Sequence, residues 1–156
     1  MKANGAYTAL VSGGFTAFSI PIGTNLGFDE QNANILVEEN GVFTGKVAEP
    51  ILGKNEKVNQ LNRLVKERGL MHSDVLAVGD GANDLGMLAI AGIGVAMHAK
   101  PIVAKKCDIL INHCDLSSLL YLQAQPIFSI YLQLFLQFFD FHYLPSNFYQ
   151  ILEKIH

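Results

Sequence analysis

The residue types best suited to chemistry gather in the string GDGAND at positions 79–84. The string contains two carboxylates, Asp80 and Asp84, and the amide of Asn83, directly after the apolar run 75–78. Mg²⁺ prefers oxygen ligands and often takes only one or two protein carboxylates together with a substrate phosphate. A helix-capping role is the alternative for Asp84 alone, because it stands at a good helix start. The whole string predicts a site for a hard divalent cation.

A second candidate site is the tripeptide Ser12-Gly13-Gly14, which ends another apolar run. A serine hydroxyl and the backbone N–H groups exposed by two glycines can donate to phosphate oxygens. A simple strand-to-helix turn is the plainer alternative. A nucleophilic serine is a further one, but Ser12 lacks a G-x-S-x-G setting and has no histidine placed as its base.

Lys57 is a third candidate, at the start of an amphipathic helical pattern that precedes the run 75–78. Its ammonium could reach a phosphate as a point charge and offset nearby negative charge. The alternative is a solvated surface lysine, which is the usual situation of a single lysine. Lys46 and Lys54 are neighbours with which it could be confused.

These candidates depend on elements that would bring them together. Short apolar runs alternate with helical patterns, which predicts a parallel sheet covered by helices on both faces, an α/β fold. In such sheets ligands bind at the carboxyl ends of the strands, where the candidate residues fall. Strands are predicted at 6–12, 75–78, 94–97 and 109–111, a hairpin at 35–37 and 42–47, and helices at 16–26, 55–68, 84–91, 102–107 and 116–122.

The last part of the chain has a different composition, which predicts a core at 1–123 and an aromatic-rich extension at 124–156. Nine of the fifteen Phe and Tyr residues lie between Phe128 and Tyr149, and no glycine follows Gly94. A weak membrane anchor, a buried or partner-facing helix, and an extension without a selected role are the three interpretations. Apolar residues spaced by three and four favour a helix.

Composition excludes several classes of protein. The net charge of −3 provides no broad basic surface for nucleic acid, and the mean hydropathy of +0.27 indicates a packed core. Two cysteines are too few for a disulfide scaffold. The first residues lack the pattern of a signal peptide, so we expect a cytoplasmic protein without a membrane partner.

Taken together, the motifs resemble the haloacid dehalogenase superfamily and, within it, the phosphoserine phosphatase family. The resemblance covers residues 1 to about 123. Its segments are ALVSGGFT (9–16), a flap-like stretch (27–47), GKNEKV around Lys57, VGDGANDLGML (78–88) and AKP (99–101).

The resemblance implies a Rossmann-like core and the Mg²⁺-dependent hydrolysis of O-phospho-L-serine to L-serine and phosphate, a step of serine biosynthesis. In the family an aspartate attacks phosphorus and forms an aspartyl-phosphate. The implied roles in this chain are Mg²⁺ ligation by Asp80, phosphoryl binding by Ser12, the Gly13 N–H and Lys57, a hydrogen bond from Asn83 to phosphate or substrate, and support of the metal or the lysine by Asp84.

The chain departs from the family at the nucleophile. The family carries an Asp-x-Asp-x-Ser/Thr segment at the end of a central strand, whereas no two aspartates here are separated by one residue. That strand would lie between those ending at Ser12 and at Asp80, and the helical cap is also missing. We therefore expect an amino-truncated form that is inactive or weak alone.

Loss of the central strand would leave a gap in the sheet, because open strand edges invite pairing. The aromatic extension or a second copy of the chain would then cover the exposed apolar surface, and a complementing N-terminal fragment is an alternative partner. The alternatives to phosphoserine hydrolysis are a non-catalytic remnant that binds phosphate or a partner, and a superfamily member acting on another phosphate ester.

Overall fold

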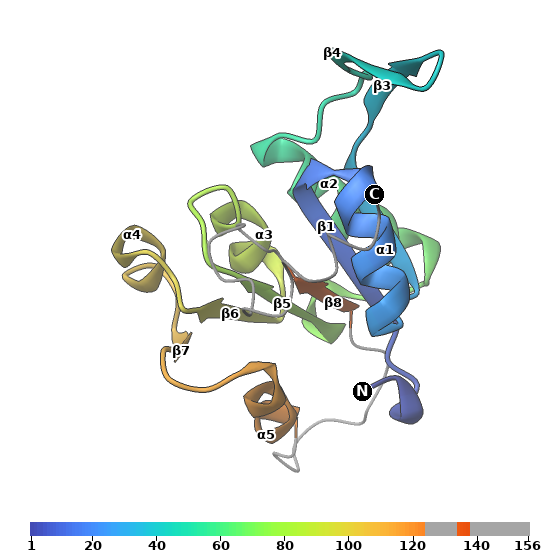
Figure 1. The fold of residues 1–156 in the computed structure, drawn as a ribbon. Helices are drawn as coiled ribbons and strands as arrows, with labels where there is room; N and C mark the ends of the chain where they lie inside the picture. Colours follow the sequence, from blue (N-terminus) through green and yellow to red (C-terminus); the bar gives the residue numbers. More distant parts are fainter. Residues whose placement is uncertain (124–133, 138–156) are drawn as a thin grey trace.

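The computed structural model describes residues 1–123 and 134–137. Its centre is a six-stranded sheet in the order β2-β1-β8-β5-β6-β7, in which every neighbouring pair is parallel (Figure 1). A separate antiparallel pair, β3-β4, forms a hairpin. The strands are β1 (Thr8–Phe15), β2 (Glu30–Asn34), β3 (Leu36–Glu39), β4 (Val42–Val47), β5 (Val75–Gly79), β6 (Ile93–Met97), β7 (Ile109–Ile111) and β8 (Leu134–Gln137).

Helices cover both faces of the sheet, as the alternating pattern predicts. Figure 1 shows α1 and α2 on opposite sides of β1. The α-helices are α1 (Thr16–Leu26), α2 (Lys54–Glu67), α3 (Leu85–Ile90), α4 (Pro101–Ala104) and α5 (Leu119–Gln123), and three short 3-10 turns are η1 (Lys2–Asn4), η2 (His72–Asp74) and η3 (Leu116–Ser118).

The apolar run of β5 divides between two buried clusters, one on each face of the sheet. Val75 and Ala77 pack in the cluster that contains α2, α3 and α4. Leu76 and Val78 pack in the other cluster, with Leu119 of α5. Because successive strand side chains point to opposite faces, an uninterrupted apolar run is what a strand covered on both sides requires.

Strand β8 lies between β1 and β5 and pairs with both in parallel. Leu136 is in register with Ala9 on one side and with Ala77 on the other. This corrects two expectations: residues 134–137 are a strand rather than part of a helix, and the described sheet has no gap at this position. The remainder of the extension, and so the other expectations about it, lies outside the described residues.

The structure also differs from the predicted elements at β2 and α4. Strand β2 is not predicted because its sequence, EQNAN, contains no run of apolar residues. It lies at the edge of the sheet, where fewer side chains must be buried, so a polar sequence can form a strand there. Helix α4 is shorter than the predicted 102–107. In residues 1–123 and 134–137, every helix falls short of the length and apolarity that a membrane crossing requires.

Candidate functional site at the carboxyl edge of the sheet

The predicted site residues come from three elements that end or begin at one edge of the sheet. Ser12 lies near the carboxyl end of β1, and Asp80 directly follows β5. Both strands are parallel to β8 and hence to each other, so their carboxyl ends share an edge. Lys57 lies in the first turn of α2, and its ion pair with Asp84 joins this helix to the loop after β5.

Lys57 and Asp84 form an ion pair in which both side chains are buried, with 3% and 1% of their surfaces exposed. The Lys57 Nζ donates to Asp84 Oδ1. A buried charge is tolerated only when it is paired and hydrogen-bonded. The surface-lysine alternative for Lys57 is therefore wrong: its ammonium is held inside the protein, against the loop that follows β5.

The second carboxylate oxygen of Asp84 shapes the loop at the end of β5. Asp84 Oδ2 accepts the backbone N–H groups of Asp80, at 3.0 Å, and of Gly81, at 2.9 Å. Asp84 stands at the start of α3, but its side chain caps no helical N–H. The helix-cap alternative is thus not what the structure shows, because the carboxylate turns back toward the residues that precede it.

Gly79 makes this arrangement possible. A Cβ at Gly79 would lie 2.5 Å from Asp84 Cβ and 2.7 Å from Asp84 Oδ2, closer than real Cβ contacts. The absence of a side chain at the last residue of β5 therefore lets Asp84 pack directly against the strand. Gly79 thereby acts through Asp84 on the position of Lys57, a role that no local pattern in the sequence indicates.

Ser12 lies partly exposed in an irregular part of β1, and its Oγ accepts the N–H of Gly14 at 3.0 Å. Gly13 is exposed, and a Cβ there would have only Leu52 O within reach, at 4.0 Å. The space beside this loop is therefore open enough for a small anion to approach the backbone.

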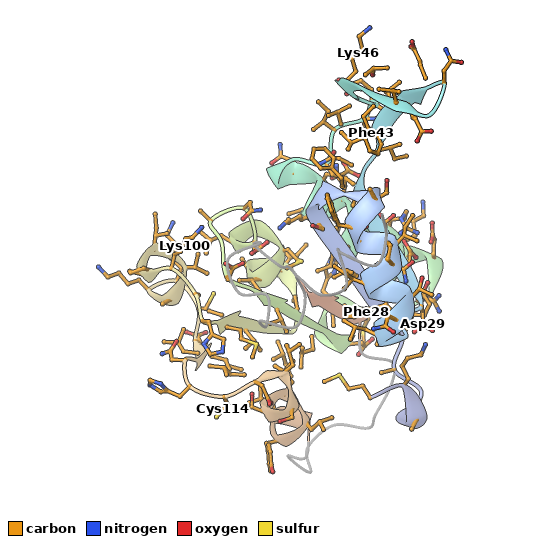
Figure 2. The ribbon with its side chains drawn as sticks, in the orientation of Figure 1. Phe28, Asp29, Phe43, Lys46, Lys100 and Cys114 are labelled. Atoms are coloured by element: carbon orange, nitrogen blue, oxygen red, sulfur yellow. The ribbon has the colours of Figure 1, made fainter. Side chains whose placement is uncertain are left out.

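Asp80 and Asn83 occupy the rim of the site. Asp80 is partly exposed, Asn83 is exposed, and the Asp80 carbonyl accepts the N–H of Lys100 at 3.1 Å. Figure 2 shows the Lys100 side chain beside α4. Asp80 is thus the more exposed of the two aspartates of this loop, and Asp84 is the buried one.

The chemistry of the donor set suits Mg²⁺ only with further oxygen ligands. Within the described part of the chain, no three His, Cys, Asp or Glu side chains group closely enough to hold a metal. Both Asp84 oxygens already accept hydrogen bonds. One protein carboxylate, that of Asp80, fits a Mg²⁺ that takes its other ligands from a phosphate and from water.

The β3-β4 hairpin extends from the same edge, because β3 follows the carboxyl end of β2 within two residues. It projects away from the sheet (Figure 1), and Figure 2 labels Phe43 and Lys46 on it. Val42 and Phe43 are exposed large apolar residues. Of the flap-like stretch expected at 27–47, residues 36–47 are therefore an extended hairpin at this end of the molecule, whereas residues 30–34 form β2 of the main sheet.

Two carboxylates with a lowered pKa, Asp29 and Glu30, lie near the amino end of β1 instead. Burial alone would raise the pKa of Glu30, but hydrogen bonds from Asn32 and Tyr7 and the charge of Arg63 outweigh it, so the pKa is lower than usual. Asp29 behaves alike: burial opposes ionisation, and hydrogen bonds from Lys2 and Thr8 lower its pKa. These groups stabilise the fold and stand apart from the candidate site.

Comparison with known proteins finds a family model and relatives that match this chain. Residues 1–89 match the family model of haloacid dehalogenase-like hydrolases. A phosphoserine phosphatase of Methanocaldococcus jannaschii is 41% identical over 120 residues, which are 77% of this chain and 57% of that protein. One from Haemophilus influenzae is 41% identical over 115 residues, 74% of this chain and 37% of that protein.

Solved structures show the same likeness. A phospho-aspartyl intermediate analogue of phosphoserine phosphatase superposes with a TM-score of 0.72 at 40% identity, covering 78% of this chain and 58% of the other. A HAD family hydrolase from Salmonella enterica gives a TM-score of 0.77 at 33% identity, covering 81% and 43%. The chain thus spans about half the length of the proteins it resembles.

Proposed function

Because the chain belongs to the haloacid dehalogenase-like hydrolase family, we propose that the carboxyl edge of its sheet binds the phosphoryl group of a phosphomonoester together with Mg²⁺. O-phospho-L-serine is the proposed ester, since phosphoserine phosphatases are about 40% identical to this chain. The observation that carries the proposal is the buried pairing of Lys57 with Asp84, which joins α2 to the loop bearing Asp80.

Each residue of the site has a proposed part in binding. Ser12 Oγ and the Gly13 N–H hold phosphoryl oxygens on the β1 side, and the Lys57 ammonium supplies positive charge from α2. Asp80 holds Mg²⁺, which when bound neutralises charge on the phosphate. Asn83, exposed at the rim, donates to the phosphate or to the rest of the substrate.

Asp84 has a supporting part. Its carboxylate faces Lys57 and two backbone N–H groups, so it fixes the orientation of the ammonium and the shape of the Asp80 loop without touching the substrate. Such supporting contacts orient binding groups and strengthen them.

Turnover by this chain alone is proposed to be weak or absent. The loop that follows β5 supplies two carboxylates, Asp80 and Asp84, and both already have a part. A covalent phosphoryl transfer needs a further carboxylate as nucleophile. A polypeptide that complements the amino-terminal side of the sheet would have to provide it.

This shortage favours a second candidate function, the binding of phosphate or of a phosphorylated partner without hydrolysis. Both functions use the same site. A cytoplasmic location fits either one, since Cys107 and Cys114 are free thiols in the structure.

The test is a calorimetric titration of the purified full chain with inorganic phosphate and with O-phospho-L-serine, with and without Mg²⁺, alongside an assay of serine release. We expect Mg²⁺-dependent binding that Asp80→Asn weakens at least tenfold. Asp108→Asn, an exposed carboxylate before the amino end of β7, is the matched control and should bind as the wild type does. Absence of Mg²⁺-dependent binding would refute the site. Rapid serine release would refute only the expected inactivity.

A further inference from the structure

The side chain of Asn34 links two segments of the candidate site that are distant in sequence. Asn34 is the last residue of β2 and is only 6% exposed. Its Nδ2 donates to the carbonyl oxygen of Gly13 at 2.9 Å, and its Oδ1 accepts the N–H of Leu52 at 2.6 Å. The two partners lie 21 and 18 residues away along the chain.

The Gly13 carbonyl needs a side-chain donor because the β1-β2 ladder is interrupted there. Val11 pairs with Asn32 and Phe15 with Asn34. Between these pairs β1 has three residues, 12 to 14, whereas β2 has one, residue 33, so β1 carries two extra residues in an irregular loop. Backbone groups in such a loop lose their ladder partners. The Asn34 amide replaces one of them at Gly13.

The other end of the Asn34 amide reaches the start of α2. Leu52 precedes Gly53, the residue that begins the helix, and Lys57 lies one turn further on. A connected path therefore runs from Gly13 through Asn34 and Leu52 into α2. Lys57 continues it by its ion pair with Asp84.

This path matters because the two halves of the site are not on neighbouring strands. Since β8 lies between β1 and β5, their axes are separated by two strand spacings, about 10 Å. The Lys57 ammonium, carried by α2, serves both the Ser12 loop and the Asp80 loop only if α2 is held at a set distance from each. Asp84 fixes that distance on the β5 side, and Asn34 fixes it on the β1 side.

We propose that Asn34 is a positioning residue for phosphoryl binding, which fixes the Ser12-Gly13 loop relative to the start of α2 and thereby to Lys57. This inference rests on the proposed function of the site. An amide is required here, because it donates at one end and accepts at the other. A carboxylate cannot donate to Gly13, and an aliphatic side chain can do neither.

The sharpest test is Asn34→Asp, which keeps the shape of the side chain and the acceptor for the Leu52 N–H but loses the donor to Gly13. Asn32→Asp is the matched control: it makes the same change in the same strand, where the Asn32 amide donates to Glu30 instead. Asn34→Ser, which introduces no charge, is a second variant in case Asn34→Asp does not fold.

We expect Asn34→Asp to lower the Mg²⁺-dependent affinity for inorganic phosphate about tenfold, the effect of roughly one lost hydrogen bond together with a displaced loop. Asn32→Asp should retain affinity within about twofold even where its unfolding free energy falls, since its stability effect is local. Wild-type affinity in a folded Asn34→Asp or Asn34→Ser protein would overturn the proposal.

Amide NMR spectra separate this inference from the proposed function. In the absence of any ligand, Asn34→Asp should shift the backbone amide signals of Gly13 and Gly14, and Asn32→Asp should leave them in place. Unchanged signals would overturn the positioning role whether or not phosphate binds. If the signals shift but the wild-type protein binds no phosphate, the missing binding refutes the proposed function alone.

Discussion

Lys57 and Asp84 lie 27 residues apart in the chain and form a buried ion pair between α2 and the loop that follows β5. The same carboxylate accepts two backbone N–H groups of that loop. The pair therefore combines a structural function with the orientation of a cation toward the carboxyl edge. Replacing either Lys57 or Asp84 should therefore affect both the stability of the fold and the candidate site.

Replacing the cation should be more harmful than replacing both partners. Lys57→Met leaves the Asp84 charge buried without its cation and should lower the free energy of unfolding by about 3–5 kcal/mol. The double variant Lys57→Met/Asp84→Asn should recover part of that loss, because an asparagine carbonyl oxygen can still accept the loop N–H groups. Urea denaturation measures both values, and a double variant less stable than Lys57→Met would contradict this account.

Adding a methyl group at Gly79 should displace Asp84 and so disturb the loop that follows β5. Gly79→Ala would place a Cβ 2.5 Å from Asp84 Cβ, so Asp84 must move and release Lys57. We expect a loss of about 1–3 kcal/mol in unfolding free energy, typical of overpacking, with weakened phosphate binding. Gly53→Ala is the control, since nothing lies within 4 Å of a Cβ there. Equal stability of the two variants would show that the close contact is not limiting.

Acid should remove the contribution of Glu30 to stability. The pKa of Glu30 is lowered in the folded protein by Asn32, Tyr7 and Arg63, which outweigh its burial. Its stabilisation is therefore complete above the pKa of the unfolded chain and is lost as the pH falls through the folded value. We expect Glu30→Gln to be less stable than the wild type by about 1 kcal/mol near neutral pH.

That difference should shrink toward zero as the pH is lowered below about 4. Denaturation of both proteins at a series of pH values measures it, and a difference that stays constant with pH would contradict the assignment. The Glu30 side chain is 23% exposed, so solvent screening keeps the effect small.

A proline in β8 tests whether this strand holds the sheet together. Leu136 pairs in register with β1 and with β5, so Leu136→Pro removes a ladder N–H in the interior of the sheet and should cost about 3 kcal/mol or more. Lys54→Pro, at the first residue of α2, is the control and should cost little, because helices tolerate proline there. Equal thermal stability of Leu136→Pro and the wild type would show that β8 is dispensable.

Local patterns in the sequence determined most of the sheet and its helices. The uninterrupted apolar run of β5 required cover on both faces, and the amphipathic repeat of α2 required one buried face. The GDGAND string and the Ser12 loop were recognisable because each places glycine and short polar residues directly at the end of an apolar run. These features depend on neighbours within a few residues, which a sequence displays directly.

Only the tertiary structure decided the contacts between distant segments. The position of residues 134–137 in the middle of the sheet, the burial of Lys57 against Asp84, and the bridge from Asn34 to Gly13 and Leu52 join segments 18 or more residues apart. A backbone carbonyl forms a hydrogen bond, and a buried charge forms an ion pair, with whichever suitable group the packing of the chain places beside it. That choice depends on the arrangement of the whole chain and leaves no periodic signal in the sequence.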